Sequence, residues 1–70
     1  MAMLTIDDMR TAPQCMELPW QVAKAMYSEA CQAYDRMGWV EGESDEDDGE
    51  LIGRYHKGNE MVKITYQELD

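Results

Sequence analysis

The residues best suited to chemistry form one acidic run between positions 41 and 50. The run contains seven carboxylates and no cation. Gly42 and Gly49 loosen its backbone, and its like charges repel one another and resist packing into a core. We therefore expect a flexible acidic loop over residues 41–50.

Carboxylates in a loop can bind calcium, and this chemistry makes a definite demand on spacing. An EF-hand loop places oxygen ligands at alternate positions, a glycine at the sixth position and a glutamate at the twelfth. Aligning Gly49 with that glycine puts Ser44 first and Tyr55 twelfth, so the pattern fails. Two cysteines and one histidine are also too few for a four-ligand zinc site. No metal and no other cofactor is predicted.

The same carboxylates can instead imitate nucleic acid. On an extended backbone, alternate side chains lie roughly 6.6 Å apart, close to the ~6.8 Å that two nucleotide steps cover along one DNA strand. The alternative is a solvated linker that only keeps the protein soluble. Because tryptophan is enriched at interfaces, nearby apolar residues join the acidic ones as partner-binding candidates. These candidates are Glu43, Asp45, Glu46, Asp47, Asp48, Glu50, Trp39, Val40 and Trp20.

Catalysis would require a nucleophile beside a base. His56 is the one histidine, and Cys15 and Cys31 are the two thiols. Nothing in the sequence places either thiol beside His56, and no glycine-rich phosphate loop, G-x-S-x-G elbow or H-E-x-x-H motif is present. We expect two free thiols, no catalytic residues and no enzymatic activity.

A long helix must position the acidic run from its N-terminal side. Apolar residues between Leu18 and Trp39 recur at three- and four-residue steps, which predicts an amphipathic helix over about 19–38. Pro19 suits its start and Gly38 its end. The expected buried stripe is Pro19, Val22, Ala23, Met26, Tyr27, Ala30, Ala33, Tyr34 and Met37.

An N-terminal arm over residues 1–17 precedes this helix. Thr5 is followed three residues later by Asp8, a pattern typical of a capped helix start, and Pro13 ends any helix before it. We therefore expect a short helical turn from Ile6 to about Arg10, and no structural role for Met1 and Ala2. Leu4, Ile6, Met9 and Met16 are expected to lie against the long helix.

A β-hairpin follows the acidic run. Apolar residues alternate from Leu51 to Tyr66, and Gly58-Asn59 is a two-residue turn signal with glycine at the first central position. This turn places Leu51, Gly53, Tyr55 and Lys57 opposite Tyr66, Ile64, Val62 and Glu60 on the core face. Arg54, His56 and Lys63 form a cationic strip on the other face, which we expect to attract the acidic loop of the same chain or of a neighbouring subunit. Since a two-stranded ribbon is marginally stable, Trp39-Val40 or the hairpin of a second subunit should complete the sheet.

The sequence thus predicts a single α+β domain over residues 1–70. The net charge of −9 disfavours direct binding to nucleic acid and to anionic membranes, and it favours a basic partner. No apolar run approaches the roughly 20 residues that cross a bilayer, and no signal peptide is present, so we expect a cytoplasmic protein.

The functional hypothesis is a non-enzymatic acidic protein that inhibits or regulates a basic, nucleic-acid-binding protein. Small anionic chains of this kind are typical of phages and mobile elements. The alternative is a structural or assembly subunit that oligomerises through its hairpin or its helix. A homodimer is expected because a chain of 70 residues buries only a small core.

Overall fold

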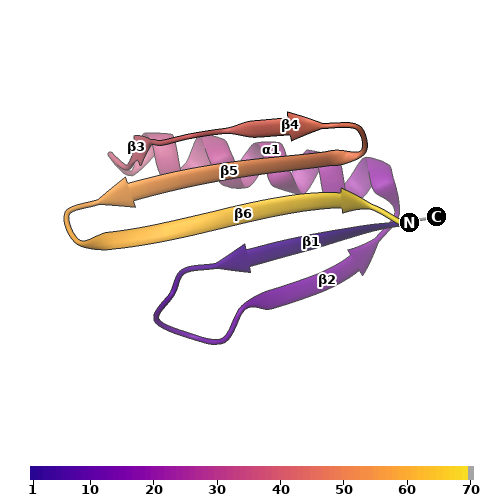
Figure 1. The fold of residues 1–70 in the computed structure, drawn as a ribbon, viewed down its shortest axis with the longest axis horizontal. Helices are drawn as coiled ribbons and strands as arrows, with labels where there is room; N and C mark the ends of the chain where they lie inside the picture. The colour runs from indigo at the N-terminus through magenta and orange to yellow at the C-terminus, as the bar shows by residue number, and fades with distance from the viewer. Residues whose placement is uncertain (70) are drawn as a thin grey trace.

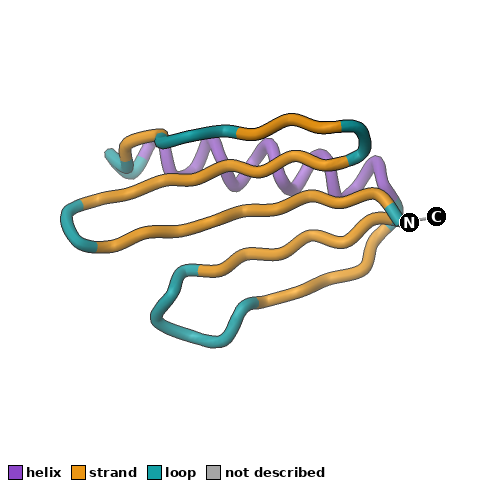
Figure 2. The backbone as a smooth tube through the Cα atoms, viewed as in Figure 1, coloured by secondary structure: helices purple, strands orange, loops and turns teal. Residues whose placement is uncertain are grey.

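One helix lies across one face of a six-stranded antiparallel sheet (Figure 1). The computed structural model describes residues 1–69, and it confirms the predicted α+β class. Strands account for most of the regular secondary structure, as Figure 2 shows. The elements in chain order are β1 (Ala2–Asp7), β2 (Gln14–Leu18), α1 (Trp20–Arg36), β3 (Val40–Glu41), β4 (Asp45–Asp47), β5 (Glu50–Lys57) and β6 (Glu60–Glu68).

The strand order is β2-β1-β6-β5, and the two short strands β3 and β4 both pair with the outer side of β5. Val40 lies opposite His56, so the region around Val40 completes the sheet on that side as expected. The other side of the hairpin pairs with β1, which the sequence did not predict. Both edges of the hairpin are therefore occupied within the chain, and β2 and β4 are outer strands.

The β5–β6 hairpin has the register that its turn predicted. Lys57 lies opposite Glu60, and the pairing continues without a bulge to Glu50 and Gln67. Gly58 has a φ of +61°, the left-handed conformation that the first central position requires. The core face of the hairpin contributes most of the buried side chains, which are Tyr55, Val62, Ile64 and Tyr66.

The N-terminal segment corrects a prediction. The expected helical turn from Ile6 to Arg10 is wrong, since Ala2–Asp7 is a strand in the middle of the sheet. Ala2 and Leu4 are 0% exposed, so Ala2 has a structural role after all. The alternation of Ala2, Leu4 and Ile6 places three apolar side chains on the helix-facing side, and burial there outweighs the local capping pattern.

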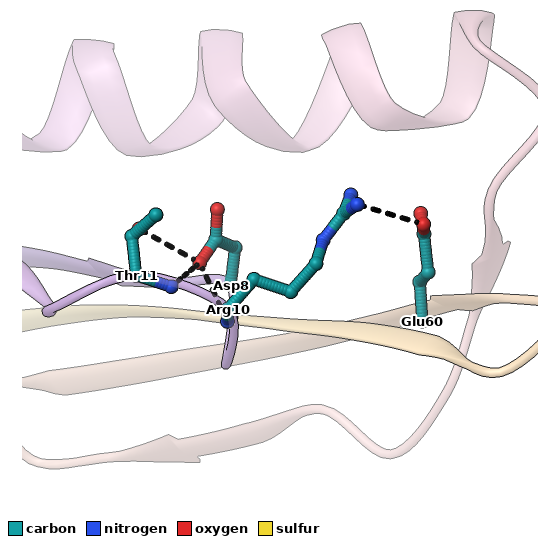
Figure 3. Close-up of polar contacts among 4 residues, drawn as sticks. All are labelled: Asp8, Arg10, Thr11 and Glu60. Carbon is teal, nitrogen blue, oxygen red and sulfur yellow. Dashed lines mark hydrogen bonds and ion pairs between the residues drawn. The ribbon is translucent and has the colours of Figure 1, made fainter.

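Asp8, the residue after β1, holds the β1–β2 turn instead of a helix start (Figure 3). The Asp8 Oδ1 atom accepts hydrogen bonds from the backbone N–H groups of Arg10 and Thr11 and from the Thr11 hydroxyl, each at 3.0 Å. The Thr11 and Arg10 backbone bonds lower the pKa of the Asp8 carboxyl. Arg10 also contacts Glu60 at 3.0 Å. Met9 has a φ of +67° and is exposed, so it does not lie against the helix as predicted.

The helix begins at Trp20 with Pro19 at its N-cap position, and it ends at Arg36. Gly38 follows with a φ of +86°, and the Lys57 ammonium donates a hydrogen bond to the Met37 carbonyl at 3.2 Å. The predicted stripe is correct in its centre, where Ala23 is buried and Met26, Tyr27, Ala30, Ala33 and Tyr34 are half-buried. Its margins are wrong, since Val22 and Met37 are exposed.

Gly53 of β5 lies beneath two side chains of the helix, Tyr27 and Cys31. A Cβ atom at Gly53 would lie 3.0 Å from the Tyr27 hydroxyl and 3.4 Å from the Cys31 sulfur, so a side chain there would crowd these two side chains. Burial, together with the neighbouring Cys31, raises the pKa of Tyr27 to about 12. No helix in residues 1–69 is long and apolar enough to cross a membrane.

Candidate functional site

The acidic run forms one outer edge of the sheet, and we call residues 41–50 the acidic edge. It is less of a loop than predicted, because Asp45–Asp47 is a strand that pairs with the start of β5. Gly49 makes this pairing feasible, since its φ of +76° allows a tight turn. The β5 backbone supplies hydrogen-bond partners, while the carboxylates stay in solvent where their repulsion is weak. Every residue from 41 to 48 is exposed.

A shallow hollow of about 430 Å³ lies at the turn of the acidic edge. It is lined by Asp47, Asp48, Gly49, Glu50, Gln67 and Glu68. Four carboxylates from two segments distant in sequence therefore surround one opening.

Glu68 is a site residue that the sequence analysis missed. It lies next to the turn because its backbone N–H donates to the Gly49 carbonyl at 2.8 Å. The signal was present in the hairpin register, because extending the pairing of Leu51 with Tyr66 by two residues puts Gly49 opposite Glu68.

The acidic edge is largely unneutralised. Arg54 of the cationic strip contacts the Asp45 carboxylate at 2.8 Å, which is the attraction between strip and acidic run that the sequence predicted. The side chains of Arg54 and Asp45 are 32% and 62% exposed, so solvent screens this pair. Within residues 1–69, no ion pair joins the other carboxylates of the acidic edge to a cation. No three His, Cys, Asp or Glu side chains of the described chain converge as metal ligands would.

The three apolar candidates occupy different surroundings. Val40 lies in β3 at the far end of the acidic edge and is 55% exposed. Trp39 is half-buried and packs edge-on against Tyr34, with ring centroids 5.1 Å apart. Trp20 is 47% exposed at the first turn of α1. Lys24 lines a second hollow beside the acidic turn. Residues four positions apart are neighbours on a helix surface, so Trp20 lies on the same side of the helix as Lys24, toward the acidic turn.

The catalytic candidates are not brought together. Cys15 lies on β2 and His56 on β5, and three strand spacings of about 4.8 Å separate these strands. Cys31 lies on the helix side of the sheet, whereas His56 follows buried Tyr55 and so points to the opposite face. Both thiols are free, as predicted.

Comparisons with protein-family models, with curated proteins and with solved structures gave no match.

Proposed function

We propose that this chain is a non-enzymatic acidic binding protein that occupies the basic surface of a protein partner and thereby inhibits or regulates it. A nucleic-acid-binding protein of the cytoplasm is the partner class that fits best, because its cationic groove already accepts a row of anions. One observation supports this proposal above the others. The acidic edge presents exposed carboxylates in an extended row, and Asp45 alone among them is paired with a cation within the described residues.

The extended backbone of β4 supports mimicry of a phosphate row. Asp45 and Asp47 project on one side of the strand and Glu46 on the other. Successive carboxylates on one side lie roughly 6.6 Å apart, similar to two steps of a nucleic-acid strand. Inhibitors that act by this mimicry suit phages and mobile elements, and we extend that origin to this chain as part of the proposal.

Charge attracts a partner but does not hold a specific one, so apolar contacts must add affinity. Trp20 and Val40 are exposed near the two ends of the acidic edge and can supply such contacts. Trp39 is already packed against Tyr34, and we expect it to contribute less than Trp20.

The test begins with recovery of a partner from the source cell by pull-down at low and at high salt. Association is then measured for the wild type and for two variants that each remove two charges. Asp47→Asn with Asp48→Asn removes two of the four carboxylates around the hollow, and the Asn side chain keeps the acceptor that the Asp48 N–H uses at position 47. Glu29→Gln with Asp35→Asn is the matched control on exposed helix positions.

We expect the hollow variant to associate roughly tenfold more slowly at low salt, because steering depends on the local field, while the helix variant changes much less. Full neutralisation of Asp45, Glu46, Asp47 and Asp48 should slow association further, and Trp20→Ala should speed dissociation. Equal binding by the fully neutralised variant and the wild type would refute the proposal. The acidic edge would then be a solvated segment, and a structural or assembly role would become the better explanation.

A further inference from the structure

The sheet has a second outer strand, β2, whose free side carries no pairing partner within residues 1–69. We propose that β2 pairs antiparallel with β2 of a second copy, so that two sheets join into one continuous sheet. Unpaired backbone N–H and C=O groups along an outer strand are a template for such pairing. In Figure 1 β2 is an outermost strand, and none of residues 1–69 forms a strand beyond it.

An apolar strip runs alongside this free strand on the helix side of the sheet. Met16 and Leu18 of β2 are half-buried there. Val22 of α1 is 46% exposed. Lys24 lines the hollow beside the acidic turn, so it lies on the side of the helix that faces β4. Each helical residue turns the chain by about 100°, which places Val22 about 200° from Lys24. Val22 therefore lies on the opposite side of the helix, toward β2. A second copy on β2 would cover this strip and remove apolar surface from water.

The residues of β2 permit a symmetric pairing without charge conflict. A two-fold axis at Met16 aligns all five residues of the strand, and it places Met16 opposite the partner's Met16. Cys15 then lies opposite the partner's Glu17 on the other face of the sheet, in two equivalent pairs. No carboxylate faces another carboxylate in this register, whereas an axis at Glu17 would bring two of them together.

The charge of the chain does not prevent this dimer. The acidic edge is four strand spacings from β2, about 19 Å at about 4.8 Å per strand. In the dimer the two acidic edges lie at opposite ends of the joined sheet. Four strand spacings in each copy and one spacing between the copies separate them, which amounts to about 43 Å. That separation is several times the Debye length of about 8 Å at physiological salt. The dimer also leaves both acidic edges free, and it does not depend on the proposed function.

The test uses sedimentation equilibrium of the full chain in reducing buffer, from micromolar to millimolar concentration. Cys15→Asp puts a carboxylate opposite the partner's Glu17 in both symmetric pairs. We expect this variant to dissociate roughly two- to thirtyfold more readily, the range for two like-charge cross-strand pairs. Cys15→Ser should match the wild type. Gln21→Glu adds the same charge at an exposed helix position and should also leave the dimer nearly unchanged.

A charge exchange completes the test. Combining Cys15→Asp with Glu17→Lys restores opposite charges in both pairs, and we expect the double variant to dimerise at least as well as the wild type. Both positions are exposed, and circular dichroism checks that each variant stays folded. A chain that sediments at its monomer mass of 8.1 kDa at every concentration and salt would overturn the proposal. So would a dimer that responds to none of these charges, because it would use another surface.

Discussion

The two outer edges of the sheet differ in charge, and that difference determines what each one accepts. The β2 edge carries a single carboxylate, Glu17, beside an apolar strip. The opposite edge consists of β3 and β4, whose residues are mostly acidic and exposed. Both edges offer free backbone groups. A second copy suits the β2 edge, whereas self-pairing of β4 would align carboxylates with carboxylates and is disfavoured.

The acidic edge has the features that protect an outer strand from indiscriminate pairing. Natural sheets protect outer strands with charge, with bends and with short length. The acidic edge uses all three, since it is interrupted between Glu41 and Asp45 and its strands are only two and three residues long. The β2 edge is longer and less charged, which leaves it as the side where one defined contact can form.

The largest effect should come from the core that both edges share. Leu4 is fully buried in the central strand β1. We expect Leu4→Ala to lower the free energy of unfolding by about 2–5 kcal/mol, because it removes buried methyl groups and leaves a cavity. Urea denaturation followed by circular dichroism measures this change. Partner binding and dimerisation should fall together as the folded fraction falls. Met61→Ala on the exposed side of β6 should cost much less, and equal losses from the two variants would contradict the placement of β1 in the core.

The hairpin and the helix could be predicted because their signals are local. Gly58-Asn59 fixes the register of β5 and β6 through a two-residue turn, and the pairing of Lys57 with Glu60 follows directly. The helix is readable from apolar spacing and from Gly38 at its end. The centre of the candidate site was equally accessible, since its carboxylates are consecutive in the sequence.

Strand β1 was missed because its pairing with β6 is non-local. Ala2 pairs with Glu68 at the other end of the chain, and no local pattern reports such a contact. The short alternation through Leu4 competed with a capping pattern at Thr5, and the local rule gave the wrong answer. The charge of Asp45–Asp47 predicts a loop, because like charges repel one another. The segment is a strand because it pairs with the free side of β5, and the sequence gives no local signal for that pairing.

Salt should distinguish the two edges without any mutation. We expect an oligolysine peptide to bind the acidic edge at least tenfold more weakly at high salt than at low salt, because exposed charges are screened. Dimerisation through β2 should instead strengthen slightly as salt rises, because it brings together two chains of net charge −9. Fluorescence anisotropy and sedimentation across one salt series measure the two responses. If dimerisation weakened with salt as peptide binding does, the dimer would be an electrostatic contact and the contrast between the edges would fail.

A smaller effect should follow from loosening the acidic edge. Arg54 connects β5 to Asp45 of β4, so Arg54→Ala should let β4 separate from β5 more often. The cost to global stability should be at most about 1 kcal/mol, because the pair is partly exposed. Hydrogen exchange of the β4 amides should nevertheless accelerate clearly. Lys63→Ala is the matched control, since Lys63 lies opposite Arg54 and has no ion pair within the described residues. Equal exchange in the two variants would show that Arg54 does not hold β4 in place.

The smallest effect concerns the turn that leads into β2. Hydrogen bonds from the backbone N–H groups of Thr11 and Arg10 hold the pKa of the Asp8 carboxyl below its ordinary value of about 3.9. Since the folded pKa is lower than the unfolded one, Asp8 stabilises the fold fully above the unfolded pKa, and this contribution is lost as the pH falls through the folded pKa. NMR titration should therefore show the Asp8 carboxyl protonating below its ordinary range, and the N–H signals of Arg10 and Thr11 should shift with it. Asp8→Ala should remove these shifts and lower the stability slightly at neutral pH, with the difference from wild type vanishing in strong acid.

Asp8→Ala should also loosen the start of β2 and weaken the dimer, while the acidic edge keeps its affinity for oligolysine. An Asp8 variant that altered peptide binding and left the dimer intact would reverse the assignment of the two edges.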